Sequence, residues 1–167
     1  MPREIERKFL LRNNDWKGTA TGKKYRQGYL SNRPECTVRV RIVGDRAFLA
    51  IKGATVGATR LEYEYEIPVG EAQEMLQRLC LPSIIEKTRY VVPHADHTWE
   101  IDEFQGENRG LLLAEIELES EDEIFEVPGW IGAEVTEDPR YYNASLAAYP
   151  FQKWREPQTP DDPAGTS

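Results

Sequence analysis

Cysteine and histidine are scarce in this sequence of 167 residues, which contains two of each. Cys36 and Cys80 match no spacing typical of a metal or redox site, and a cysteine pair in an intracellular chain is more often reduced than disulfide-bonded. We therefore predict no role for either thiol. His94 and His97 lie in a segment typical of a surface turn between strands, which favours an exposed position over a functional one.

Long apolar runs and an excess of positive charge are also lacking. The first residues, 1–11, alternate charged with apolar side chains, unlike a signal peptide, and no later segment approaches the length of a membrane span. With 29 acidic and 21 basic residues the net charge is −8, whereas a general nucleic-acid binder needs a cationic surface. We therefore expect a cytoplasmic protein with no membrane or nucleic-acid partner, in which any phosphate site is local. Formation of a homodimer stays open.

Strand-forming residues dominate what is present. Five segments are rich in Val, Ile, Tyr, Phe, Trp and Leu, often with an apolar residue at every second position: 25–30, 37–53, 61–68, 86–93 and 97–120. The two longest segments must fold back as hairpins. Their turns are predicted at Val43–Arg46 and Gln105–Gly110, because both places contain glycine where a turn needs positive φ. Together with an N-terminal strand, the sequence predicts about eight strands.

Two helices are predicted among these strands. The first covers Glu71–Leu79, where apolar residues follow the spacing of one helical face. The residues on that face are Ala72, Met75, Leu76 and Leu79. The second is a short helix at Asn143–Ala148, with Asn143 as its N-cap and Pro150 ending it.

A single domain is expected over residues 1–154, followed by a disordered tail at 155–167 that contains no core-forming residue. A chain that is nearly all strand, with about eight strands of this length, has enough sheet to close a barrel. The predicted fold class is therefore mainly β, as a closed eight-stranded antiparallel barrel that forms a tunnel, with a few flanking helices.

Charged residues recur at every second position of the predicted strands, so one face of each strand is charged. These sets are Glu4, Glu6 and Lys8; Arg39 and Arg41; Glu62, Glu64 and Glu66; Lys87 and Arg89; Glu100 and Asp102; and Glu115, Glu117 and Glu119. The simplest interpretation is the solvated side of an antiparallel sheet.

Segregation of the charges by strand favours a second interpretation, in which this face lines a lumen. Acidic clusters are offered by Glu4 and Glu6 with Glu115 and Glu117. A cationic cluster is offered by Arg39, Arg41, Lys52, Lys87 and Arg89. Carboxylates bind hard divalent cations through oxygen, and arginine and lysine bind phosphoryl oxygens. A lumen of this kind would be a polyphosphate site.

The N-terminal segment Glu4-x-Glu6-x-Lys8 resembles the Glu-x-Glu-x-Lys signature of the CYTH superfamily, the triphosphate tunnel metalloenzymes. Further segments are similar in the same order, and the resemblance covers roughly residues 3–150. They are Thr-Val-Arg39-Val-Arg41, Ile-Lys52-Gly, Arg60-Leu-Glu62-Tyr-Glu64, Glu-Lys87-Thr-Arg89-Tyr, Trp-Glu-Ile-Asp102, Leu-Ala-Glu115-Ile-Glu117-Leu and Glu-Val-Thr-Glu-Asp-Pro-Arg-Tyr-Tyr-Asn143.

The resemblance implies a triphosphate threaded through the tunnel, dependence on Mg²⁺ or Mn²⁺, and hydrolysis or transfer at a phosphoanhydride. The metal ligands it implies are Glu4, Glu6, Asp102, Glu115 and Glu117. The substrate-binding residues it implies are Lys8, Arg39, Arg41, Lys52, Lys87 and Arg89. The catalytic residues it implies are Lys8, Lys52, Lys87, Glu62 and Glu64. Of these we expect Lys52 and Lys87 to stabilise the leaving pyrophosphate, while a base could be Glu62, Glu64 or Asp102.

Inorganic triphosphate is the substrate we expect, because no surface for stacking a base or a thiazole ring can be recognised in the sequence. A nucleotide-acting enzyme is the first alternative, either an adenylate cyclase or a nucleoside or thiamine triphosphatase. A non-catalytic barrel that binds polyphosphate is the second. The third is a barrel scaffold without a ligand, whose charged faces meet solvent.

Overall fold

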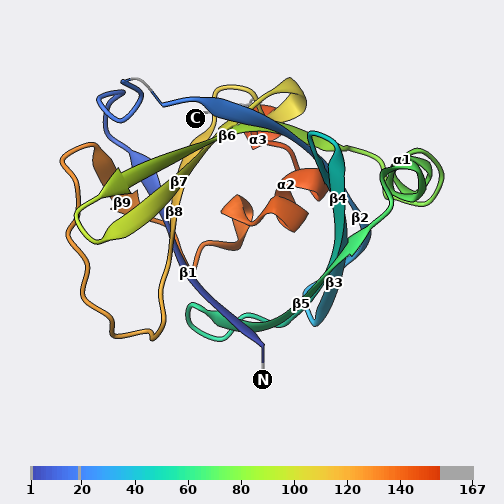
Figure 1. Cartoon of the computed structure of the whole chain (residues 1–167), viewed down its shortest axis with the longest axis horizontal. Helices are drawn as coiled ribbons and strands as arrows, with labels where there is room; N and C mark the ends of the chain where they lie inside the picture. The colour runs from blue at the N-terminus through green and yellow to red at the C-terminus, as the bar shows by residue number, and fades with distance from the viewer. Residues whose placement is uncertain (1, 19, 155–167) are drawn as a thin grey trace, which may run out of the picture.

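Antiparallel strands dominate the computed structural model, which describes residues 2–18 and 20–154 (Figure 1). The strands are β1 (Arg3–Leu11), β2 (Gly22–Arg33), β3 (Cys36–Val43), β4 (Arg46–Gly53), β5 (Thr59–Ile67), β6 (Ile85–His94), β7 (His97–Phe104), β8 (Leu112–Glu117) and β9 (Ile131–Glu134). All eight predicted strands are present, and the short β9 is an addition that the sequence did not predict. The expected tail, residues 155–167, lies outside the described residues.

The sheet closes on itself, which confirms the predicted fold class. The strands run in the order β5-β4-β3-β2-β6-β7-β8-β1-β9, and β5 also pairs with β1. That pairing joins Arg3–Ile5 to Thr59–Leu61 and completes a ring of eight strands. Farther along β1, Phe9 and Leu11 pair with β9, which takes over the edge of β1 that β5 leaves.

The predicted hairpins form where glycine permits a turn. Strands β3 and β4 pair up to Val43 and Arg46, and Gly44 between them has a φ of +62°. Strands β7 and β8 are joined through the short 3₁₀ helix η1 (Gly106–Asn108), whose first residue has a φ of +64°. Both positive φ values belong to a region that glycine enters without steric cost.

Helix α1 (Val69–Arg78) packs on the outer face of β2, β3 and β4. Ala72 and Leu76 are buried there, as the predicted apolar face requires. Gly28 of β2 permits the close approach, since a Cβ at that position would lie 3.0 Å from Leu76 Cδ2. The helix ends one residue before the predicted boundary, and Leu79 is 65% exposed rather than packed.

Helix α2 (Asn143–Ala148) lies inside the ring, preceded by the 3₁₀ helix η2 (Pro139–Tyr141) and followed by α3 (Phe151–Trp154) (Figure 1). Its Leu146 packs against inward-facing apolar residues of the wall. These include Tyr29, Ile85, Phe104 and Leu113. The bounds of α2 match the prediction, but its place inside the ring does not match a flanking helix.

The predicted N-cap of α2 is wrong. Tyr142 is the N-cap and makes no side-chain capping bond, while Asn143 is the first helical residue. A capping side chain must turn back to the backbone N–H groups of its own helix. The Asn143 side chain instead bonds to the barrel wall, at Lys87 and Gln27.

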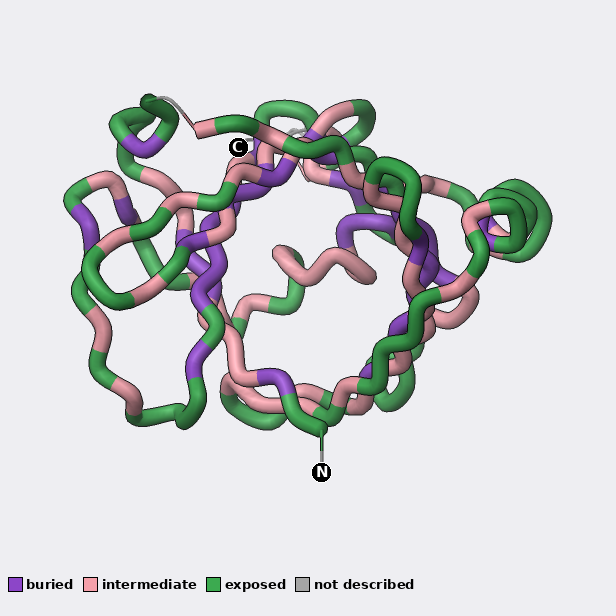
Figure 2. The backbone as a smooth tube through the Cα atoms, in the orientation of Figure 1, coloured by how far each residue is buried: buried purple, intermediate pink, exposed green. Residues whose placement is uncertain are grey.

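The polarity of the barrel is opposite to that of an ordinary domain, because charged side chains are buried inside while much of the apolar core lies outside the wall. Lys87 and Asp102, on the inner face, are each 1% exposed. Trp99, on the outer face of β7, is 0% exposed beneath a loop that contributes Phe125 and Trp130. Figure 2 shows buried residues recurring along the ring, among half-buried and exposed ones. Most of the charged strand positions therefore line a lumen, whereas Glu66 and Glu119, at the ends of their sets, are exposed.

No helix in the described part of the chain has the length and apolar character needed to cross a membrane.

Candidate active site

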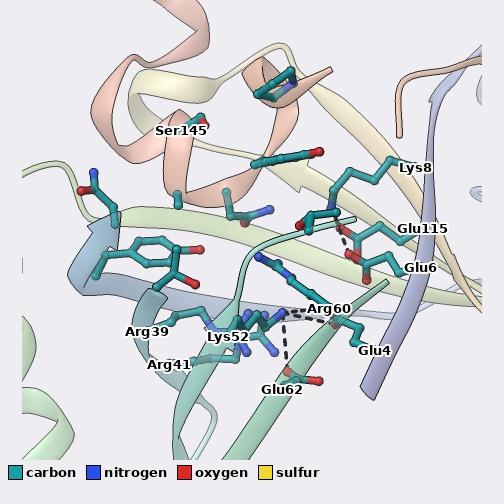
Figure 3. Close-up of a pocket in the computed structure, with 18 of the residues that line it drawn as sticks. Glu4, Glu6, Lys8, Arg39, Arg41, Lys52, Arg60, Glu62, Glu115 and Ser145 are labelled. Carbon is teal, nitrogen blue, oxygen red and sulfur yellow. Dashed lines mark hydrogen bonds and ion pairs between the residues drawn. The ribbon is translucent and has the colours of Figure 1, made fainter. Parts of the chain in front are cut away.

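A cavity of about 590 Å³ lies inside the ring, with charged side chains from most of the strands around it (Figure 3). Its cationic lining residues are Lys8, Arg39, Arg41, Lys52, Arg60, Lys87 and Arg89. Its acidic lining residues are Glu4, Glu6, Glu62, Glu64, Glu100, Glu115 and Glu117. Alternation along each strand brings them together, because residues two apart point to the same side.

Glu4 anchors one group of ion pairs in the cavity. Lys52 Nζ donates to its two carboxylate oxygens at 3.1 and 3.2 Å, and Arg60 Nε donates at 3.3 Å. Lys52 Nζ also lies 3.5 Å from Glu62. Burial alone would raise the pKa of Glu4, but the two cations outweigh burial and lower it. Glu4 is therefore ionised and already partnered.

Glu115 anchors a second group on the opposite side of β1. It accepts hydrogen bonds from Lys8 Nζ and, at 3.2 Å, from Arg89 Nη2. Lys8 Nζ also donates to Glu6 at 3.3 Å. Burial would raise the pKa of Glu115, but Lys8 and Arg89 hold it well below its usual value. For Glu6 burial prevails, and together with the neighbouring Glu115 it raises the pKa to about 7.

Asp102, on the inner face of β7 but not among the residues that line the cavity, supports two cations. Arg89 donates to its two carboxylate oxygens at 2.7 and 2.9 Å, and Lys87 Nζ donates at 2.7 Å. Burial opposes ionisation of this group, yet Arg89 and Lys87 lower its pKa to about 2. Burial acts the other way on Lys87, and it lowers the pKa of the ammonium group to about 7 despite the adjacent Asp102.

Arg39 and Arg41 carry positive charge that the wall neutralises least. Arg39 Nε is buried without a hydrogen-bond partner, and Arg39 Nη2 reaches Glu64 at 3.3 Å. Arg41 donates to the neutral Gln27 at 3.1 Å, and among the described residues no ion pair joins it to a carboxylate. Burial, Arg39 and Arg89 lower the pKa of Arg41 to about 10. This part of the cavity is suited to an anion with several oxygens.

The carboxylates expected to bind a divalent cation stand on adjacent strands, where Glu6 is paired with Glu117 and Lys8 with Glu115. Across the described residues, no three acidic, His or Cys side chains yet converge on one point. The donor chemistry nevertheless fits, because Mg²⁺ and Mn²⁺ prefer carboxylate oxygen. Burial, and then the neighbouring Glu115, raise the pKa of Glu6, so additional positive charge would favour its ionised form. A divalent cation would supply it.

The cavity contains every predicted site residue except one. The predicted residues that line it are Glu4, Glu6, Lys8, Arg39, Arg41, Lys52, Glu62, Glu64, Lys87, Arg89, Glu115 and Glu117. Asp102, predicted as a metal ligand or a base, is not among the lining residues, and its oxygens are bonded to Arg89 and Lys87. Its position suits a residue that orients these two cations.

Several lining residues were not predicted. Glu100 belongs to a charged strand face that alternation identified but was given no site role, and Arg60 lies two residues from Glu62, where alternation could have found it. Tyr25 also lines the cavity, and the guanidinium carbons of Arg41 and Arg89 lie 5.0 and 5.1 Å from its ring centre. Asn143 belongs to no strand, so alternation gave no indication of it.

An antiparallel β-ring that encloses paired carboxylates and incompletely neutralised arginines has the features of a tunnel protein for a polyanion. Across residues 2–148 the chain matches the CYTH domain, and it belongs to this family.

Two relatives carry the name inorganic triphosphatase. One, from Acetivibrio thermocellus, is 50% identical over 156 residues, which cover 93% of this chain and 100% of that protein. Another, from Nitrosomonas europaea, is 40% identical over 148 residues, covering 86% and 96% of the two chains. A crystal structure described as an inorganic triphosphatase is also similar, with a TM-score of 0.63 and 36% identity over 86% of this chain and 96% of that one.

Proposed function

We propose that this protein is a divalent-metal-dependent inorganic triphosphatase, which hydrolyses tripolyphosphate to pyrophosphate and phosphate inside the barrel. The observation that supports the proposal most strongly is the placement of two weakly neutralised arginines, the buried Arg39 and the half-buried Arg41, across the cavity from the carboxylates of β1 and β8. The names of the relatives from A. thermocellus and N. europaea support the same activity.

Binding of tripolyphosphate depends on cations that several strands contribute. Arg39 and Arg41 come from β3, Lys52 from β4, and Lys87 and Arg89 from β6. A chain of three phosphoryl groups offers oxygens along its whole length, so it can contact several of these cations at once. We assign substrate binding to these five residues and to Lys8. An inorganic substrate, recognised by charge alone, suits such a lining.

Metal binding is assigned to Glu4, Glu6, Glu115 and Glu117. A bound Mg²⁺ or Mn²⁺ would neutralise charge on the phosphoryl oxygens and favour ionisation of an attacking water. The carboxylates of this group now hold Lys8, Lys52 and Arg60. These cations keep the site compact and aim the carboxylates into the cavity.

Proton transfer is assigned to Lys87. Its pKa of about 7, lowered by burial, leaves both protonation states accessible near neutral pH. The neutral amine can accept a proton from the attacking water, and the ammonium group then stabilises the charge on the leaving pyrophosphate. Asp102, with a pKa of about 2 and its oxygens occupied, is a poor base. Glu62 and Glu64 remain the alternative bases.

Phosphate release tests the proposal. Tripolyphosphate, ATP, thiamine triphosphate and pyrophosphate are compared at pH 7 to 9 with Mg²⁺, Mn²⁺ or a chelator. We expect turnover of tripolyphosphate to require the metal. We also expect turnover to fall at least 100-fold in Glu4→Gln, because the substitution removes one charged partner from a buried site. Glu66→Gln is the matched control, because Glu66 is on the same sheet but pairs with Arg46 at the surface.

Each alternative has its own outcome in this experiment. Cyclic AMP formed from ATP would indicate a cyclase, and preferential cleavage of ATP or thiamine triphosphate would indicate an organic substrate. Binding of tripolyphosphate without metal-dependent turnover, in a folded protein, would leave a binding barrel.

A further inference from the structure

Asn143 lines the cavity, but neither the charge pattern nor the proposed chemistry explains its presence there. Its Oδ1 atom accepts two hydrogen bonds, from Lys87 Nζ at 3.0 Å and from Gln27 Nε2 at 3.0 Å. Both donors belong to the barrel wall, on β6 and β2, whereas Asn143 begins the inner helix α2. One amide oxygen thus joins the helix inside the ring to two strands of the wall.

The partners of Lys87 explain why this contact matters. Lys87 Nζ bonds to Asp102 of the β7 wall strand, which does not line the cavity, at 2.7 Å, and to Asn143, which does. Asp102 draws the ammonium group toward the wall, and Asn143 draws it toward the cavity. A lysine side chain has four rotatable bonds, so a single partner fixes its tip poorly. The second bond therefore determines where the tip points.

Gln27 holds the Asn143 oxygen in place. It is 0% exposed, and its two ends are both bonded: Nε2 donates to Asn143, and Oε1 accepts from Arg41 Nε at 3.1 Å. A buried amide satisfied at both ends has one favourable orientation, because the reversed amide would oppose donor to donor and acceptor to acceptor. The chain Arg41–Gln27–Asn143–Lys87 therefore connects a substrate-binding arginine to the lysine.

We propose that Asn143 is a positioning residue, which directs the Lys87 amine into the cavity and couples it to the inner helix. This inference rests on the proposed function for its effect on catalysis, but the contact itself can be tested without turnover.

Kinetics of Asn143→Leu, Lys87→Met and the double variant test the catalytic effect. Leucine keeps the side-chain volume and removes the acceptor oxygen. We expect kcat for tripolyphosphate to fall about 10- to 100-fold, the range for one hydrogen bond to a charged group, with a smaller change in KM. In the Lys87→Met background the same substitution should change kcat less than about 2-fold, because Asn143 acts through Lys87. Asn143→Asp, which retains the acceptor, should be less impaired than Asn143→Leu.

Gln152→Ala is the control for loss of stability. Gln152 of α3 also docks a C-terminal helix by an amide hydrogen bond, to the Arg109 carbonyl, but it does not line the cavity. We expect this variant to lower the melting temperature without lowering kcat. A loss of melting temperature in Asn143→Leu with unchanged kcat would show a purely structural role and overturn the proposal. If Asn143→Leu lowered kcat by the same factor in the wild type and in the Lys87→Met variant, the proposal would also be overturned.

NMR of the Lys87 ε-methylene group, assigned by its absence in Lys87→Met, tests the contact in the resting protein. A fixed lysine tip gives two inequivalent ε protons, which we expect to merge in Asn143→Leu and to stay distinct in Gln152→Ala. An unchanged signal in Asn143→Leu overturns the proposal whatever the activity. If the wild type shows the fixed lysine and no turnover of tripolyphosphate, the proposed function fails while the positioning of Lys87 stands.

Discussion

At the scale of single residues, the site is a balance between carboxylates and internal cations. Glu6 is the least balanced of them, since burial and the neighbouring Glu115 raise its pKa to about 7 while Lys8 only partly compensates. Folding must therefore either keep a proton on Glu6 or tolerate a buried anion. A bound metal ion would stabilise that anion, because a nearby positive charge favours the ionised form of a carboxyl group.

Glu6→Gln should make the metal-free protein more stable at alkaline pH. The pKa of Glu6 is higher in the folded protein than in the unfolded chain. The protonated carboxyl group therefore stabilises the fold fully below pH 4.5, and this stabilisation is lost as the pH rises through about 7. Glutamine has no such loss. We expect the free energies of unfolding of variant and wild type to be similar at pH 5 and to differ by about 2 kcal/mol at pH 8.

Urea unfolding at the two pH values, with a chelator present, measures this difference. Glu66→Gln serves as the control, because Glu66 is exposed beside Arg46, whose hydrogen bonds lower its pKa. A difference between Glu6→Gln and wild type that does not grow with pH would contradict the expectation.

Arg39→Ala should weaken binding of tripolyphosphate. Arg39 lines the cavity, and in the described part of the chain its one ion pair is with Glu64 through Nη2, so a phosphoryl oxygen can bond to its guanidinium group without breaking a second ion pair. Removal of a charge-assisted bond of this kind costs about 10- to 100-fold in affinity. Calorimetry with tripolyphosphate and a chelator measures the dissociation constant, and Arg46→Ala, at the surface, is the control. Equal affinity in both variants would remove Arg39 from the binding site.

Strand alternation predicted most of the residues that line the cavity, because only the face of the strand on which each residue lies had to be known. Once the sheet closed, Glu4, Lys52 and Lys87 had to share a lumen. The roles of the residues were harder to predict, since they depend on contacts across the ring. Asp102 lies on the same face of its strand as the cavity-lining Glu100, yet its oxygens are bonded to Arg89 and Lys87. Such a partnership is a property of the tertiary structure.

At the scale of secondary-structure elements, the inner and outer faces of the barrel wall make different kinds of contact. The inner face holds the charges, and the outer face packs against α1 and against the loop that covers Trp99. The shortest strand was not predicted from the sequence. β9 has four residues, too few for a clear period, and it forms because the second half of β1 has a free edge. The bounds of α2 followed from local sequence, but its place inside the ring required the closed sheet.

Gly28→Val should destabilise the fold and leave the site intact. A Cβ at position 28 would lie 2.7 Å from Ile84 Cδ1 and 3.0 Å from Leu76 Cδ2, so α1 would have to shift outward. Overpacking of this kind costs about 1 to 3 kcal/mol. Since Gly28 faces outward on β2, KM for tripolyphosphate should be unchanged. Thermal unfolding and kinetics on one preparation test both statements, and a raised KM would show that the two faces are coupled.

At the scale of the whole molecule, the ring is closed by a short junction. Strands β1 and β5 pair over Arg3–Ile5 alone, whereas the β2–β3 and β6–β7 pairs extend over most of their strands. Side chains add a second connection across the junction, from Glu4 on β1 to Lys52 on β4 and Arg60 on β5. A ligand held by cations of β3, β4 and β6 would brace the same ring from within.

Tripolyphosphate should therefore raise the melting temperature, and Arg41→Met should remove much of this effect. At 100 times its dissociation constant a ligand stabilises the folded state by about 2.7 kcal/mol, or roughly 5 to 10 °C for a chain of this size. Without ligand, the variant should be within about 1 kcal/mol of wild type. Relief of the burial and repulsion that lower the pKa of Arg41 to about 10 offsets the loss of its bond to Gln27.

Thermal scans with a chelator present, with and without tripolyphosphate, compare the two proteins while turnover is blocked. The expected pattern, near-equal stability without ligand and unequal stability with it, arises only if Arg41 serves the ligand more than the fold. An Arg41→Met variant that is several kcal/mol less stable than wild type without ligand would show the reverse. The cations of the lumen would then belong to the architecture of the ring, as in a barrel scaffold whose charges bind one another.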